Sequence, residues 1–202
     1  HTDNRRQRQM CIRDSSCVKN AVQNIEDLLN SQYLDSKQTI QSQLTEIIAK
    51  IGENIVVRRM KFVDSKENHL QKYIHNSVNE FSGKIGVLLK YDCKSKNENT
   101  NELSKNICMH IAASDPKSLD IDSLDKTLVD KEESIYKEQL KSSNKPENIV
   151  EKIVEGKVKK YYEEVCLLEQ FFVMDNKLKI KDLISDFNSK ENENFKISAY
   201  YI

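Results

Sequence analysis

Apolar residues in the first fifty positions recur at intervals of three and four residues, which is the repeat of an amphipathic helix. One helix is predicted within residues 16–34, and a second one ends at Gly52, because glycine readily terminates a helix. The apolar positions with this spacing are Val18, Val22, Ile25, Leu28 and Leu29 in the first helix and Ile40, Leu44, Ile47 and Ile48 in the second.

Extended structure is predicted after Gly52. Residues 55–57 are β-branched, and polar and apolar residues alternate over residues 58–63 enough to predict a half-buried strand. A polar stretch follows to residue 81. Residues 83–91 give the clearest strand pattern, because their central positions are nearly all apolar.

The second half of the chain contains the longest helical patterns. A helix is predicted over residues 102–113. Two charged helices follow within residues 121–162 and are interrupted at residues 142–146, where Pro146 suits the first position of the second helix. The short connection predicts an antiparallel hairpin, and its narrow apolar edge indicates that the hairpin extends from a globular body.

Strand patterns occur on both sides of this hairpin. Residues 171–174 are strand-like, residues 178–187 predict a short helix, and residues 195–202 alternate as a final strand. The residues expected on one face of that strand are Phe195, Ile197, Ala199 and Tyr201. Helices and strands in this order predict an α+β fold.

Composition narrows the functional class. The chain has 202 residues with 32 basic and 32 acidic side chains, so it lacks the basic surplus of a nucleic-acid or anionic-membrane binder. Glu and Asp beside the lysines also argue against RNA binding by the charged helices. No apolar run approaches the roughly 18 residues of a membrane span.

Residues 1–15, here called the head, differ in composition from the rest of the chain, although the overall charge is balanced. Residues 1–15 carry four of the six arginines and a net charge of +2, while the remainder of the chain carries −2. We interpret this head as a foreign, artefactual stretch and exclude it from the fold. The alternative is an Arg-rich arm for nucleic acid or for targeting.

Residues typical of covalent or metal chemistry do not form a recognisable motif. The five cysteines are odd in number and include no CxxC pair, which predicts reduced thiols. Cys108 and His110 lie in an apolar run, where a structural role is favoured over metal binding. Phosphate-loop, GxSxG and HExxH motifs are absent, so we expect neither an enzyme nor a cofactor.

Several segments resemble bacterial and organellar elongation factor Ts, in the order of that family. They are Ala49-Lys50-Ile51-Gly52-Glu53-Asn54-Ile55 with Arg58-Arg59, Tyr73-Ile74-His75 with Gly83-Lys84-Ile85-Gly86-Val87-Leu88, Met109-His110-Ile111-Ala112-Ala113-Ser114 with Pro116, Lys145-Pro146 with Ile153-Val154-Glu155-Gly156-Lys157-Val158-Lys159-Lys160, and Phe172-Val173-Met174-Asp175. The resemblance covers residues 16–202.

The resemblance implies a guanine-nucleotide exchange factor for the translational GTPase elongation factor Tu, acting in protein biosynthesis without covalent chemistry. It also implies two related α+β subdomains with a coiled-coil-like hairpin inserted in the second. We accordingly expect an N-terminal subdomain over residues 16–92, a C-terminal subdomain over residues 93–120 and 167–202, and the hairpin over residues 121–166. The expected location is the bacterial cytoplasm, or the mitochondrial matrix for an organellar member.

Family positions that touch the GTPase match five residues here. They are Ile51, Gly52, His75, Val173 and Met174. The alternative roles are a core residue for Ile51, a helix cap for Gly52 and a core strand for Val173 and Met174. For Arg58 and Arg59 an internal ion pair is favoured over partner contact.

The chain also departs from the family. An N-terminal docking domain and a Thr-Asp-Phe-Val motif are not found, and many members continue beyond the last strand. We therefore expect a factor shortened at both ends that docks on the GTPase but exchanges nucleotide poorly. The alternative is a scaffold without exchange activity that self-associates as a homodimer through the hairpin.

Overall fold

The computed structural model describes residues 22, 24–33, 37–63, 68–77, 83–141 and 146–202. These residues form two compact units, one within residues 1–66 and 76–84 and the other comprising residues 67–75 and 85–202. The Arg-rich head and the start of the first predicted helix lie outside the described residues.

The first unit contains α3 (Ile25–Asn30) and α4 (Ile40–Ile51). Both helices begin with a side-chain cap: Asn24 accepts a hydrogen bond from the Asp27 N–H, and Thr39 accepts one from the Ser42 N–H. A small apolar cluster holds the unit together, and its buried members are Val22, Leu28 and Ile40. The second predicted helix and its end at Gly52 are confirmed.

The strand predicted over residues 58–63 was wrong. Residues 52–63 lie outside every helix and strand of the described chain. Val57 and Met60 pack instead against the small apolar cluster. Strand propensity alone does not make a strand, because a strand also needs a partner for its backbone hydrogen bonds.

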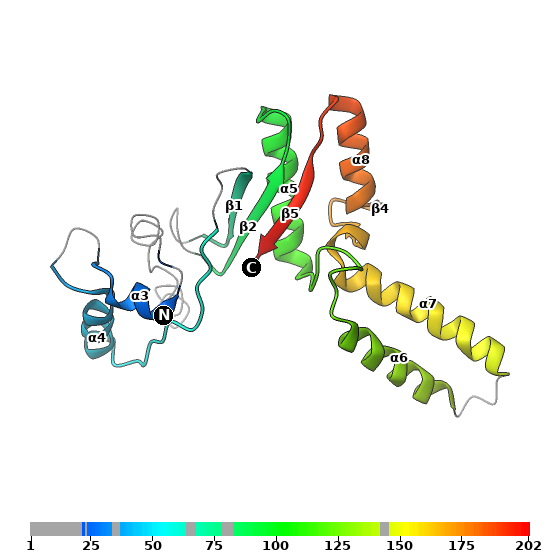
Figure 1. Cartoon of the computed structure of the whole chain (residues 1–202), viewed down its shortest axis with the longest axis horizontal. Coiled ribbons are helices and arrows are strands. Elements are labelled where there is room, and N and C mark those ends of the chain that lie inside the picture. Colours follow the sequence, from blue (N-terminus) through cyan, green and yellow to red (C-terminus); the bar gives the residue numbers. More distant parts are fainter. Residues whose placement is uncertain (1–21, 23, 34–36, 64–67, 78–82, 142–145) are drawn as a thin grey trace. The chain divides into compact units, whose positions relative to one another are not determined.

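The second unit is built on a three-stranded antiparallel sheet in the order β1-β2-β5 (Figure 1). Its strands are β1 (His69–His75), β2 (Ile85–Asp92) and β5 (Lys196–Tyr201). The prediction for β2 is confirmed. β1 was missed, because it lies in the stretch interpreted as polar and its pairing with β2 is a non-local interaction.

A bulge changes which residues of β5 face the core. Tyr91 pairs with Ile197 and Leu89 pairs with Tyr200, so one extra residue stands between the two pairs on β5. Tyr200 therefore packs against the core on the same side as Ile197. The expected alternation through Ala199 and Tyr201 was wrong, because the bulge shifts the side-chain period by one residue.

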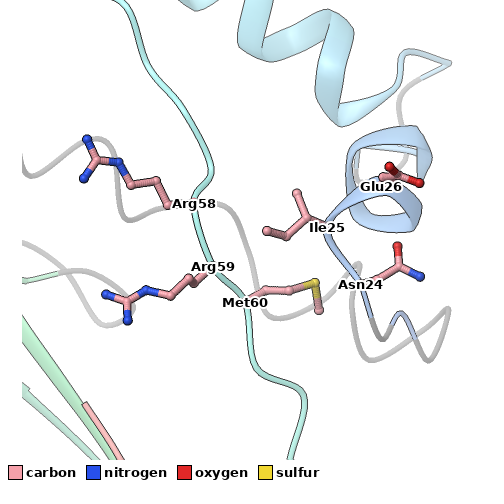
Figure 2. Close-up of a pocket in the computed structure, with 6 residues that line it drawn as sticks. All are labelled: Asn24, Ile25, Glu26, Arg58, Arg59 and Met60. Atoms are coloured by element: carbon pink, nitrogen blue, oxygen red, sulfur yellow. The ribbon is translucent and has the colours of Figure 1, made fainter.

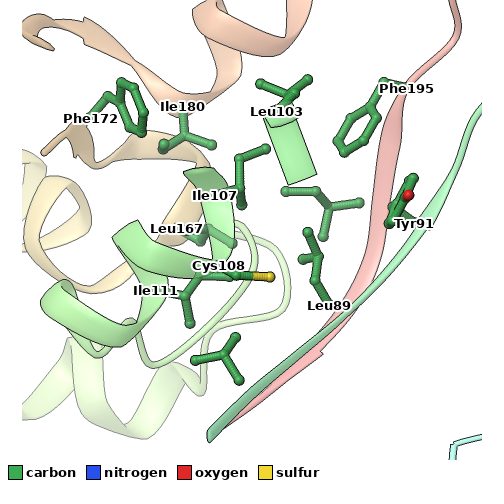
Figure 3. Packing of buried hydrophobic residues seen from close by; sticks show 12 residues of the cluster. Leu89, Tyr91, Leu103, Ile107, Cys108, Ile111, Leu167, Phe172, Ile180 and Phe195 are labelled. Atoms are coloured by element: carbon green, nitrogen blue, oxygen red, sulfur yellow. The ribbon is translucent and has the colours of Figure 1, made fainter. Parts of the chain in front are cut away.

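One helix covers the buried face of the sheet. α5 (Glu98–Ser114) contributes Leu103, Ile107, Cys108 and Ile111 to the core, and β2 contributes Val87, Leu89 and Tyr91 (Figure 3). Phe195 stacks on Tyr91 with ring centroids 4.8 Å apart. The remaining buried core residues are Ile197 of β5 and, from the segment after α7, Leu167, Phe172 and Ile180.

Two helices extend away from the sheet within this unit (Figure 1). They are α6 (Lys126–Lys141) and α7 (Glu147–Val165), and they lie side by side. Lys157 of α7 donates a hydrogen bond to Gln139 and lies over the ring of Tyr136, both on α6. Pro146 is the N-cap residue of α7, one position before the one predicted.

The segment after α7 returns to the core. It forms the 3₁₀ helix η2 (Leu167–Glu169), the short pair β3 (Phe171–Phe172) and β4 (Asp175–Lys179), and α8 (Ile180–Glu191). An α+β fold is therefore confirmed. The subdomain boundaries remain a prediction, and one sheet crosses the boundary expected at residue 92, because β2 pairs with β5.

Candidate functional site

The end of α4 presents Ile51 and Gly52. Ile51 is half-buried and Gly52 is exposed. Gly52 has φ 73°, in the left-handed region, and its N–H donates to the Ile48 carbonyl at 2.8 Å. A Cβ atom at Gly52 would meet nothing within 4 Å, so the glycine is required by the backbone conformation and not by crowding within the described chain.

Arg58 and Arg59 lie beside an open depression of about 490 Å³ that Asn24, Glu26 and Met60 also line (Figure 2). Both guanidinium groups are directed away from Glu26 in Figure 2. Both arginines are exposed. Neither forms an ion pair with a carboxylate among the described residues, so the internal ion pair expected for them is not formed there.

His75 is the last residue of β1 and is exposed. Its Nδ1 lies 3.1 Å from the hydroxyl of Tyr73, which stands on the same face of the strand. Tyr73 itself packs against the core. The tyrosine therefore connects the exposed imidazole to the folded body.

Val173 and Met174 form the turn between β3 and β4. They are 45% and 55% exposed, whereas Phe172, the residue before them, is only 7% exposed. The prediction of a strand over residues 171–174 is thus confirmed only for Phe171–Phe172. Two adjacent apolar side chains on a surface turn can contact a partner.

A buried polar network lies beneath this turn. His110 is 1% exposed and Gln170 is 4% exposed. The Val173 N–H donates to His110 Nδ1 at 3.3 Å, and His110 Nε2 lies 2.9 Å from Gln170 Oε1. Gln170 Nε2 donates to the Glu164 carbonyl at 2.6 Å, and the Ser114 hydroxyl lies 2.9 Å from Gln170 Oε1.

Burial lowers the pKa of His110, because a charged imidazole loses its hydration there, although the hydrogen bond with Gln170 opposes the shift. Burial also raises the pKa of the neighbouring Cys108 thiol to about 12. Both groups are therefore neutral near pH 7. Cys108 is fully buried in the core, in agreement with the structural role expected for it.

Ion pairs hold the base of the same turn. Lys179 Nζ lies 2.9 Å from Glu163 and 3.1 Å from Glu169, and Lys181 Nζ lies 2.8 Å from Glu169. Lys179 also lies 5.5 Å from the centre of the Phe171 ring. Burial by itself would raise the pKa of Glu169, but the hydrogen bonds from Lys181 and Lys179 and the positive charges of both lysines together lower it.

The five predicted contact residues belong to two different compact units. Ile51 and Gly52 lie in the first unit, whereas His75, Val173 and Met174 lie in the second. His110 and Gln170 were not predicted to act beside Val173, although a histidine within the apolar run 107–113 was a visible signal. Among the described residues, no group of three or more metal-ligating side chains is placed to hold a metal ion. No described helix is both long and apolar enough to cross a membrane.

Comparison with known proteins gives the family. A family model described as Elongation factor TS matches residues 12–200. The chain belongs to the elongation factor Ts family. It is 43% identical over 167 residues to Elongation factor Ts of Clostridium acetobutylicum, covering 83% of this chain and 53% of that relative.

Other elongation factor Ts proteins match in the same way. The one from Ehrlichia chaffeensis is 38% identical over 180 residues, covering 89% of this chain and 62% of the relative. The one from Rhodospirillum centenum is 36% identical over 176 residues, covering 87% and 57%. The chain thus spans little more than half the length of these curated relatives.

Proposed function

We propose that this chain binds elongation factor Tu and promotes release of GDP from it. Membership of the elongation factor Ts family supports the proposal. The observation that carries it is the pair of adjacent exposed apolar residues, Val173 and Met174, on a turn anchored by a buried network. A surface of this kind suits a protein partner better than a small polar substrate.

The proposed activity needs no covalent step. A factor that binds the nucleotide-free GTPase more tightly than the GDP-bound form lowers the affinity for GDP by the ratio of the two binding constants. The coupling is reciprocal, so GDP must weaken the complex by the same factor. Ile51, Gly52, His75, Val173 and Met174 are the proposed contacts.

The proposed location is the bacterial cytoplasm, where such a GTPase works in protein synthesis. The relatives from Clostridium acetobutylicum and Ehrlichia chaffeensis, both bacteria, support this location.

Release of fluorescently labelled GDP from elongation factor Tu, followed by stopped-flow fluorescence, tests the proposal. The chain should accelerate release, and Met174→Ala should weaken that effect by about fivefold to tenfold, as for a truncated interface anchor. Ile135→Ala is a matched control, because Ile135 is 46% exposed and lies on α6 instead. A chain that leaves GDP release unchanged at saturating concentration would refute the proposal.

The Ile135→Ala variant also tests the alternative, self-association through α6 and α7. Exposed apolar residues on these helices, Leu128, Ile135 and Ile149, favour that alternative. Light scattering after size-exclusion chromatography would then give a dimer that Ile135→Ala dissociates and elongation factor Tu does not affect. A complex with elongation factor Tu that GDP dissociates supports exchange.

A further inference from the structure

The turn formed by Val173 and Met174 has no sequence feature that fixes its conformation. It joins the paired residues Phe172 and Asp175, so the loop has two residues. Two-residue hairpin loops favour turn types with positive φ, usually provided by Gly, Asn or Asp. Neither Val173 nor Met174 has positive φ. An interaction from outside the hairpin must therefore help to hold this turn.

His110 provides that interaction. It lies on α5, 63 residues before Val173 in sequence, and its Nδ1 accepts the Val173 N–H at 3.3 Å. Its ring also lies against Phe172, with centroids 6.1 Å apart. The imidazole is almost fully buried and the hydrogen bond itself is partly buried, so His110 gives this amide an acceptor that is shielded from water.

The hydrogen bonds admit a single proton arrangement. A backbone N–H can only donate, so Nδ1 of His110 must be unprotonated and Nε2 must carry the proton. Nε2–H then donates to Gln170 Oε1, and Gln170 Nε2 donates to the Glu164 carbonyl. A flipped Gln170 amide would place two donors together on one side and two acceptors together on the other.

Gln170 in turn is held by three neighbouring elements. Its side chain contacts α5 through Ser114 and the last turn of α7 through Glu164. Its carbonyl accepts the N–H of Ile180, the first residue of α8, at 3.0 Å. The orientation of the imidazole is thus tied to the helices that surround it.

We propose that His110 is a positioning residue whose neutral imidazole, oriented by Gln170, holds the Val173 backbone and keeps Val173 and Met174 presented to the partner. The inference rests on the proposed function for the identity of the partner. The positioning of the turn does not depend on that identity.

Two conservative variants separate the two ring nitrogens. The amide of His110→Asn reaches the place of Nδ1 and can still accept the Val173 N–H, whereas the amide of His110→Gln reaches the place of Nε2 and cannot. Hydrogen exchange of the Val173 amide should accelerate about tenfold in His110→Gln and stay within about twofold in His110→Asn. The Leu89 amide in β2 should be unchanged in both variants.

Affinity for elongation factor Tu should follow the same order, with a loss of about fivefold in His110→Gln and rescue in His110→Asn. In the unsubstituted chain, ¹⁵N NMR of the imidazole should find Nε2 protonated and Nδ1 bare. A protonated Nδ1, or equal protection of Val173 in all three chains, would overturn the inference. The NMR measurement decides the matter even for variants that fail to fold. If Val173 protection follows the predicted order but no chain binds elongation factor Tu, positioning stands and the proposed partner is wrong.

Discussion

The end of α4 and the turn between β3 and β4 present their exposed residues by different means. At Gly52 the conformation is local: a left-handed φ closes the helix through a hydrogen bond to Ile48, four residues earlier. At Val173 it depends on His110, a side chain from another element. Damage to the core should therefore disturb the second surface more than the first.

The largest difference in unfolding free energy is expected between two variants in the hairpin, one in the core beneath the turn and one on its surface. Phe172→Ala should lower the free energy of unfolding by about 3–5 kcal/mol, because it removes a buried ring next to His110. Phe171→Ala is the matched control: Phe171 is 43% exposed, and its loss should cost about 1 kcal/mol or less. Urea unfolding followed by circular dichroism measures both, and equal losses would contradict the burial of Phe172 and the exposure of Phe171.

A smaller change in stability is expected when the pH is lowered. The pKa of His110 is lowered in the folded chain from an ordinary value of 6.5, so the unfolded chain takes up the proton first as pH falls. The stability contribution of the neutral imidazole is complete above pH 6.5 and is lost as pH falls toward the folded pKa. The slope should approach about 1.4 kcal/mol per pH unit at most.

Urea midpoints between pH 7.5 and 5 measure this effect. His110→Asn should reduce the pH dependence in that interval, because asparagine does not titrate there. An unchanged slope in that variant would assign the dependence to other groups.

Alanine substitution should change the stability of the chain in opposite directions at two glycines, Gly52 and Gly156. Gly52→Ala should destabilise the chain by about 1 kcal/mol, because alanine disfavours a φ of 73°. Gly156→Ala, inside α7, should stabilise by about 0.5–1 kcal/mol, since alanine favours a helix and its Cβ would meet nothing within 4 Å. Thermal unfolding of the two variants should move in opposite directions, and a shift of the same sign would refute the local explanation.

The smallest effect is expected at the end of β1. Tyr73→Phe removes only the hydroxyl that lies 3.1 Å from His75 Nδ1 and keeps the ring in the core. Stability should change by less than about 1 kcal/mol. Affinity for elongation factor Tu, measured by titration calorimetry, should fall about twofold if the orientation of His75 matters. A loss as large as that of His75→Ala would mean that Tyr73 itself makes the contact.

Two segments show how far local patterns can predict the fold. Residues 55–57 are β-branched and polar and apolar residues alternate over residues 58–63, as in a strand, yet both segments lie in irregular structure. Residues 69–75 were interpreted as polar, yet they form β1 because β2 provides a complete antiparallel partner. Helices were predicted more successfully, because their hydrogen bonds join residues four apart, whereas strands need partners from elsewhere in the chain.

The candidate functional residues show the same difference between local and non-local structure. Gly52 at the end of a helix could be recognised from sequence, since the conformation there is local. The exposure of Val173 and Met174 could not, because residues 171–174 form one apolar run and only the turn separates buried Phe172 from its exposed neighbours. The role of His110 was also hidden, since sequence spacing does not show which distant amide its ring will face.

By itself, the sequence determined the α+β class, the positions of α4, α5, α6, α7, α8, β2 and β5, and the resemblance to the elongation factor Ts family. These features follow from helical periodicity, local caps and short motifs, all of which involve neighbouring residues. Only the tertiary structure decided the pairing of β1 with β2, the bulge that turns Tyr200 toward the core, and the hydrogen bond from Val173 to His110. Each of these joins residues from different elements, and the bulge and the hydrogen bond join residues far apart in the chain, so they form only when the whole unit closes around one core.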